Sequence, residues 1–173
     1  MIDKYNEYLE KVKEDWNYIE QVPIEYRVGE ICLEAVKQDG NAMEYIPEEV
    51  INYEMVKVAI ETGRSIRYIP EKYLNYDFCE MVVKLNPFQI RFVPERFMKE
   101  ELCWLAIQKK PKSIQCIPEK YISYALCIAV LKKDPRMIKY IPDKFKDETI
   151  HDMIYDDIEM MEKYLISKRK SHI

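Results

Sequence analysis

The stretch PEKYISYALCIAVLKKDP, residues 118–135, contains the pattern that determines the fold. After its first proline, four apolar residues are spaced i, i+1, i+4 and i+5: Leu126, Cys127, Val130 and Leu131. This spacing places the four side chains on one face of an α-helix, whereas a strand would alternate apolar and polar residues. A second proline ends the stretch, so we expect the helix to stop just before it.

The same pattern recurs about every 24 residues. Six prolines, each preceded by Val or Ile, are separated by 24, 23, 24, 24 and 24 residues: Pro23, Pro47, Pro70, Pro94, Pro118 and Pro142. Numbering each proline as position 1 of its repeat aligns apolar columns at positions 9, 10, 13 and 14. Position 6 offers helix N-cap residues in four repeats: Asn52, Asn75, Ser123 and Asp147. One such helix cannot bury its apolar face alone, so the repeats must stack.

The sequence therefore predicts an all-α fold, a single α-solenoid of about six stacked 24-residue helical repeats with terminal caps. We expect one domain over residues 1–173, with a leading half-unit at 1–22, repeats at 23–146, and a closing helix with a charged tail at 147–173. Prolines that follow the main helices predict a second, short helical turn with proline at its first position: Pro87, Pro111 and Pro135.

A leucine-rich repeat is the alternative fold, because its period overlaps this one and a segment such as IRYI, residues 66–69, would then be a strand. The asparagine ladder of that repeat is missing. A ten-residue helical pattern in every unit also argues against it.

Two segments carry a resemblance to a known family: YIPEKYLNYDFCEMVVKLNP at 68–87 and CIPEKYISYALCIAVLKKDP at 116–135. Their pattern resembles a family of short, proline-punctuated helical repeats in bacterial, phage and giant-virus proteins that is classed as a domain of unknown function. The resemblance extends over about residues 20–150, with departures at Ile24 and Gly29 and a missing residue near Thr62. It implies a repeat architecture and no particular chemistry.

The residues offer no recognisable catalytic, cofactor or metal site. Four of the five cysteines occupy position 10, where Val56 stands in another repeat, which indicates a small buried apolar site: Cys32, Cys79, Cys103 and Cys127. The two histidines are too few for a typical metal or acid–base site, and nucleotide-binding and hydrolase motifs are missing. We therefore expect no catalytic residue, cofactor or metal ion.

The sequence has no apolar run long enough for a signal peptide or a membrane span. We expect a cytoplasmic protein, or one in the host-cell cytoplasm if it is virus-encoded.

Charge is distributed unevenly along the chain. Residues 1–63 contain 6 Lys or Arg and 15 Asp or Glu, whereas residues 84–146 contain 14 and 6, so the net charges are −9 and +8. Stacking would align the cations in rows. One row is at position 3: Lys72, Arg96, Lys120 and Lys144. Another follows the main helices and includes Lys109, Lys110, Lys112, Lys132, Lys133 and Arg136. Such rows suit phosphates or an acidic partner, or they are solubilising edge charges.

Comparing repeats also identifies apolar residues in columns that are otherwise charged. Position 11 holds a charged residue in three repeats, Lys57, Glu80 and Asp152, and an apolar residue in the other three, Leu33, Trp104 and Ile128. We therefore expect Trp104 and Ile128 to be exposed neighbours. Position 19 likewise holds Phe88 in a polar column, and Tyr124 lies close to Ile128 in sequence. Exposed aromatic and aliphatic side chains of this kind are typical of protein interfaces.

These features predict a non-catalytic binding protein or scaffold whose repeat surface engages another protein. Inhibition of a larger complex is one role that such a protein could have. The expected binding residues are Trp104, Ile128, Tyr124, Phe88, Lys109, Lys110, Lys112, Lys132, Lys133 and Arg136. One alternative is binding of nucleic acid or phosphate by the basic rows in residues 84–146, against which the pI of 5.4 and the acidic first third argue. Another is an enzyme whose site the sequence does not reveal. We expect no membrane partner.

Overall fold

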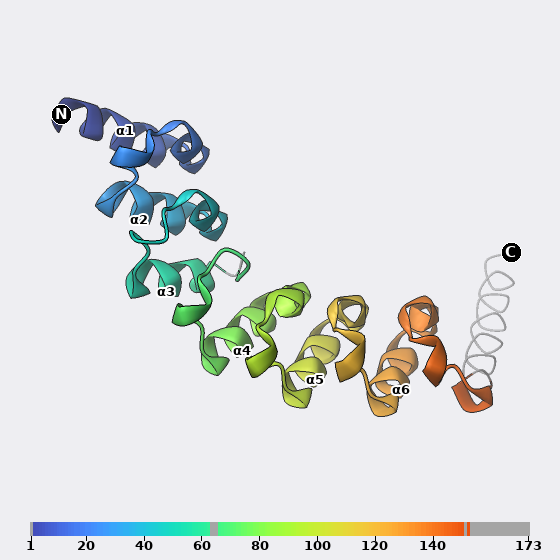
Figure 1. The fold of residues 1–173 in the computed structure, drawn as a ribbon. Helices are drawn as coiled ribbons and strands as arrows, with labels where there is room; N and C mark the ends of the chain where they lie inside the picture. Colours follow the sequence, from blue (N-terminus) through green and yellow to red (C-terminus); the bar gives the residue numbers. More distant parts are fainter. Residues whose placement is uncertain (1, 63–65, 151, 153–173) are drawn as a thin grey trace, which may run out of the picture. The chain divides into compact units, whose positions relative to one another are not determined.

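The computed structural model describes residues 2–62, 66–150 and 152, which form helices joined by short turns (Figure 1). The α-helices are α1 (Ile2–Glu14), α2 (Gly29–Gln38), α3 (Tyr53–Glu61), α4 (Tyr76–Leu85), α5 (Glu100–Lys109) and α6 (Tyr124–Lys133). The described residues contain no strand, and residues 66–69 form a turn. The predicted all-α fold is confirmed, and the leucine-rich repeat is excluded for this part of the chain.

Short 3-10 helices complete each repeat. A six-residue helix follows most of the α-helices: η1 (Trp16–Gln21), η3 (Gly40–Tyr45), η5 (Pro87–Phe92), η7 (Pro111–Cys116) and η9 (Pro135–Tyr140). A three-residue helix follows most of the repeat prolines: η2 (Ile24–Tyr26), η4 (Glu71–Tyr73), η6 (Glu95–Phe97), η8 (Glu119–Tyr121) and η10 (Asp143–Phe145). Pro87, Pro111 and Pro135 stand at the first turn of their helices, as predicted.

The four predicted N-caps at position 6 are all formed. In each, the side-chain oxygen accepts a hydrogen bond from the backbone N–H three residues later, over 2.8 to 3.3 Å. These bonds satisfy donors that the first turn of a helix leaves unpaired. The residues are Asn52, Asn75, Ser123 and Asp147.

The structure divides into two compact units, residues 1–98 (unit 1) and residues 99–173 (unit 2). In unit 1, α1 contacts α2, α2 contacts α3, and α3 contacts α4, while in unit 2 α5 contacts α6. The aligned apolar columns make these contacts. At position 9 every side chain is 9% exposed or less, as predicted for a core column: Ile31, Met55, Phe78, Leu102, Leu126 and Ile150.

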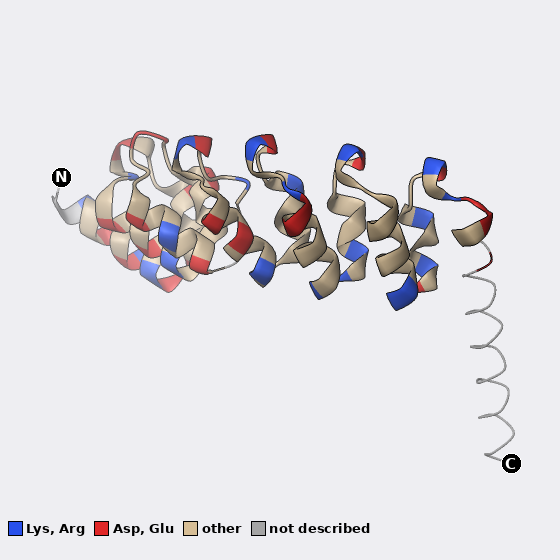
Figure 2. Cartoon of the chain, turned by 90° about the horizontal axis from the view of Figure 1, so that it is seen from below, with Lys and Arg blue, Asp and Glu red and all other residues tan. Residues whose placement is uncertain are grey.

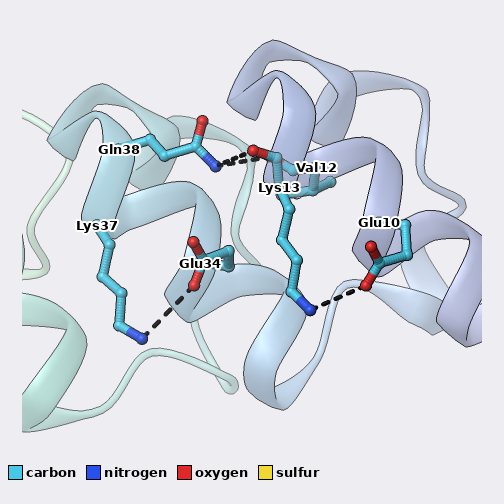
Figure 3. Close-up of polar contacts among 6 residues, drawn as sticks. All are labelled: Glu10, Val12, Lys13, Glu34, Lys37 and Gln38. Atoms are coloured by element: carbon cyan, nitrogen blue, oxygen red, sulfur yellow. Dashed lines mark hydrogen bonds and ion pairs between the residues drawn. The ribbon is translucent and has the colours of Figure 1, made fainter.

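The N-terminal segment, predicted to be a leading half-unit, contains α1 followed by η1. It is joined to the next repeat by Gln38, whose Nε2 donates to the carbonyl oxygens of Val12 at 2.7 Å and Lys13 at 3.3 Å (Figure 3). Carbonyls at the end of a helix lack partners within that helix, so Gln38 satisfies groups that α1 leaves unpaired. Residues 148–150 and 152 are helical, and the rest of the predicted closing helix and tail lies outside the described residues.

The cysteine column has the predicted packing role. Cys32, Cys79, Cys103 and Cys127 are fully buried free thiols. Burial raises the pKa of Cys32 to about 12 and the pKa of each of the other three to about 11. The thiolate is the nucleophile, so these thiols are poorly reactive in the folded protein.

We expect the four position-10 thiols of the native protein to react with Ellman's reagent at pH 8 at least about 100-fold more slowly than in the unfolded protein, because the thiolate fraction falls tenfold for each unit by which the pKa rises. Guanidinium should release all five thiols. Rapid labelling of any position-10 cysteine in the native protein, mapped by mass spectrometry, would contradict the packing assignment.

Candidate functional site

The cations at position 3 are engaged between repeats. Three of the four pair with a carboxylate at position 2 of the preceding repeat: Lys72 with Glu48 at 3.0 Å, Arg96 with Glu71 at 3.2 Å, and Lys144 with Glu119 at 3.1 Å. The same three cations also lie over the ring at position 4 of their own repeat, 4.7 to 5.3 Å from its centroid. Exposed pairs of this kind are weak, because water screens the attraction between the two charges. This row is therefore part of the packing between repeats.

The cations after the main helices behave differently. In unit 2, η7 contacts η9, and a cavity of about 400 Å³ opens between them. We call it the basic pocket. It is lined by Lys110, Pro111, Lys112, Asp134, Arg136, Met137, Lys139 and Tyr140. Three of these residues, Lys110, Lys112 and Arg136, are among the predicted binding residues, and the structure brings them together.

The charges of the basic pocket are only partly compensated. The Arg136 guanidinium forms two bonds to the Asp134 carboxylate, at 2.9 and 3.1 Å. These bonds hold the pKa of Asp134 below its usual value, so the carboxylate stays ionised and the pair is neutral overall. Lys110 and Lys112 form no ion pair within the described part of unit 2, and Lys139 lies 5.0 Å from the centroid of the Tyr140 ring. Four cations and one carboxylate give the pocket a formal charge of +3.

Lys110 also departs from a structural rule of the repeat. Position 17, just before the six-residue 3-10 helix, carries Asp15, Asp39, Asn86 and Asp134 in other described repeats. Each accepts a hydrogen bond from the backbone N–H two residues later, whereas Lys110 makes no side-chain cap. Loss of such a cap costs about 0.5–2 kcal/mol at the start of an α-helix. The fold therefore gains nothing from a lysine at this position.

The other predicted lysines flank this region without lining the pocket. Lys109 ends α5, and Lys132 and Lys133 end α6, where all three are exposed. The Lys133 ammonium donates to the carbonyl oxygen of Gln108 at 3.0 Å, in the same way that Gln38 caps α1 in unit 1. On the right of Figure 2, the blue segments that mark Lys and Arg lie mainly at the top and bottom of the cartoon.

The apolar residues expected on the surface are less exposed than predicted. Trp104 and Ile128 are half-buried, on α5 and α6, and the indole Nε1 of Trp104 donates to Glu100 at 3.3 Å. Position 11 lies at the margin of the core, where a long charged side chain can still reach water. The expectation that these two side chains are exposed was wrong for this reason. Phe88 is half-buried in η5, which belongs to unit 1.

Tyr124 is the most exposed of the predicted aromatic residues, at 37%. Its hydroxyl donates to the Asp147 carboxylate at 3.2 Å, and its ring lies edge-on to Phe145 with centroids 6.4 Å apart. Tyr124 therefore has a structural contact with the next repeat as well as an exposed surface.

Helix α6 differs from the other repeat helices in having a second apolar face. Its positions 7, 8, 11 and 12 are spaced i, i+1, i+4 and i+5 and carry no charge: Tyr124, Ala125, Ile128 and Ala129. In α3 the same positions include Glu54 and Lys57, and in α5 they include two glutamates before Trp104. We call these four residues of α6, together with Trp104, the outer apolar face. The sequence comparison found its centre but missed the two alanines, which attract no notice as single residues.

The described residues meet the requirements of neither a metal site nor a membrane-spanning helix. No group of three or more His, Cys, Asp or Glu side chains among them is placed to hold a metal ion. None of the described helices has both the length and the apolar character needed to cross a membrane.

Two overlapping stretches of the chain, residues 8–51 and 29–74, match the family described as Domain of unknown function (DUF4116). Each stretch covers nearly two repeats, and the second is displaced from the first by about one repeat, as a repeat family requires. The match confirms the predicted resemblance, although it covers the first repeats and reaches only the start of residues 68–87. No curated protein and no solved structure matches the chain.

Proposed function

We propose that the protein is a non-catalytic binding protein or scaffold for another protein. The family that residues 8–74 match is of unknown function, so the match assigns no activity and the proposal is argued from the structure. The observation that carries this proposal is the outer apolar face. Repeat helices need one apolar face to stack, and α6 has two, although the fold does not require the second. A partly exposed apolar surface that stacking does not require is typical of an interface.

The partner that fits this surface is apolar at its centre and acidic at its edge. Trp104 and Ile128 provide the large side chains that commonly contribute most to binding. The exposed Lys109, Lys132 and Lys133 at the ends of α5 and α6 supply positive charge beside them. Charges at the rim of an interface mainly raise the association rate and select complementary partners. A scaffold role and inhibition of a larger complex both use this surface.

The proposal places the protein in the cytoplasm, or in the host-cell cytoplasm if it is virus-encoded. The five cysteines support this location, because all are free thiols in the structure and a reducing compartment keeps thiols in this state.

The test is a substitution that another repeat already accepts. Ile128→Lys gives α6 the residue that α3 has at position 11, Lys57, so the variant should fold. A partner captured with the wild-type chain and then purified should bind Ile128→Lys at least about tenfold more weakly in a titration, because burying one unpaired charge costs more than one kcal/mol. Lys57→Ala, in unit 1, is the matched control and should bind with unchanged affinity.

Two outcomes would contradict the proposal. Equal affinity of the wild-type protein and Ile128→Lys would show that the outer apolar face does not bind the partner. A wild-type dimer that Ile128→Lys dissociates, measured by light scattering after size exclusion, would assign the face to self-association instead.

A further inference from the structure

We propose that the basic pocket binds a small ligand that carries two or more phosphate groups. The pocket is separate from the outer apolar face, because none of its lining residues belongs to that face. Its volume of about 400 Å³ lies within the range of about 300–1,000 Å³ that is usual for small-molecule sites.

The cations of the pocket that form no ion pair with the described residues indicate a ligand with several negative charges. Arg136 is compensated by Asp134, which leaves the ammonium groups of Lys110, Lys112 and Lys139. A lysine ammonium is a compact point charge with three donors and is a common partner of phosphate oxygens. Three such charges suit a diphosphate better than a single carboxylate.

The repeats of unit 1 show that packing does not require these charges. In that unit η1 contacts η3 as η7 contacts η9 in unit 2. The positions of Lys110 and Lys112 are occupied there by Asp15 and Asn17. The positions of Asp134, Arg136 and Lys139 are occupied by Asp39, Asn41 and Glu44. The same pair of 3-10 helices therefore forms with three acidic side chains where unit 2 has a formal charge of +3.

Lys110 gives the strongest sign that these positions are used. It replaces the capping Asp or Asn of the other described repeats and forms no cap of its own. Local structural rules are commonly broken where a residue serves binding instead of stability. A lysine here gives up a hydrogen bond that the fold would use and adds a charge to the pocket.

The rest of the lining is apolar. Pro111, Met137 and Tyr140 also line the pocket, with the Lys139 ammonium 5.0 Å from the centroid of the Tyr140 ring, and we call these three residues the apolar wall. An inorganic diphosphate would use only the cations, whereas a nucleoside diphosphate would also contact this wall. The shared chemistry is the diphosphate group, and the two sources can be distinguished by measurement.

The experiment is calorimetric titration of the full chain with inorganic pyrophosphate and, separately, with ADP, at 50 mM and 300 mM salt. We expect binding of one ligand per chain that weakens at the higher salt concentration, because screening reduces electrostatic attraction. Tighter binding of ADP than of pyrophosphate would identify an organic ligand that contacts the apolar wall. Equal affinities would identify the inorganic ion.

The decisive variant carries Lys110→Asp and Lys112→Asn, which are the residues that η1 has at these positions. It should bind both probes at least about tenfold more weakly, since charge-assisted hydrogen bonds are lost. Its thermal unfolding midpoint should be equal to or above that of the wild-type protein, because the new Asp can cap η7 as Asp15 caps η1. Lys57→Gln, which changes an exposed lysine of α3 in unit 1 outside the pocket, is the control and should bind normally.

Three results would overturn the proposal. One is the failure of the wild-type protein to bind either probe at 50 mM salt. Another is unchanged affinity in the folded double variant. The third is an equal loss of affinity in Lys57→Gln, which would show that net charge, and not the pocket, attracts the anions.

Discussion

Replacing Leu126 by alanine is expected to destabilise unit 2 by about 2–5 kcal/mol, the range measured for Leu-to-Ala changes in well-packed cores. Leu126 is fully buried at position 9 of α6, and α6 contacts α5, η7 and η9. Removing its isobutyl group forfeits the transfer free energy of the side chain and leaves a cavity that stacked repeats can close only in part. The loss is a large fraction of the stability of a small domain.

The measurement is urea unfolding followed by tryptophan fluorescence. The chain has two tryptophans, Trp16 in unit 1 and Trp104 in unit 2, so a Trp16→Phe background reports on unit 2 alone. In that background, Leu126→Ala should lower the urea midpoint with little change in slope.

Ile128→Ala is the matched control for Leu126→Ala, two residues away on the same helix. Ile128 is half-buried on the outer apolar face, so its truncation should cost about 1 kcal/mol or less. Equal costs at the two positions would show that both faces of α6 are packed within the protein. The outer apolar face would then be core, and the proposed interface would lose its basis.

The helices and their core faces could be predicted from the sequence because repetition multiplies a weak signal. A single i, i+1, i+4, i+5 pattern is ambiguous, but six aligned copies identify the columns that must be buried. The N-caps were predictable for the same reason, since Asn52, Asn75 and Ser123 act through local geometry alone.

The basic pocket was only partly predictable because it depends on two repeats at once. Lys110 and Lys112 come from one repeat, and Lys139 and Tyr140 come from the next. The row of cations after the main helices indicated the first two and Arg136. The sequence did not show that Arg136 turns back onto Asp134, or that Lys139 completes the lining. Position 3 looked equally basic in sequence, and only the contacts between repeats reveal that its cations are engaged.

Trp104 marks the limit of comparing columns. Charged residues at position 11 predicted that this column faces water, but the structure places the column at the boundary of the core. Lys57 extends from that boundary into solvent, whereas Trp104 lies along α5 and bonds to Glu100. The position of a residue in the repeat therefore predicts the direction of its Cα–Cβ bond. How exposed the side chain is also depends on its length and polarity.

Replacing Gly40 by alanine should destabilise unit 1 by about 1–3 kcal/mol, as in other overpacked sites. A Cβ atom on Gly40 would lie 2.8 Å from the carbonyl oxygen of Ala59 and 2.5 Å from Oγ1 of Thr62. Three other repeats have proline at this position: Pro87, Pro111 and Pro135. At Gly40 the close approach of α3 leaves no room for a side chain. The repeat that contains α3 is one residue short near Thr62, and this shortening accompanies the close approach.

A double-mutant cycle with Thr62→Ala, measured by urea unfolding, can separate the contribution of the Thr62 side chain to this cost from that of the Ala59 backbone. The Thr62 hydroxyl donates to the Ala59 carbonyl at 2.6 Å and is one of the two obstacles. Removing the hydroxyl relieves the side-chain contact but leaves the backbone oxygen in place. The Gly40→Ala cost should therefore fall in the Thr62→Ala background without disappearing. A stabilising Gly40→Ala, as at a glycine with free space, would show that η3 and α3 are not in this close contact.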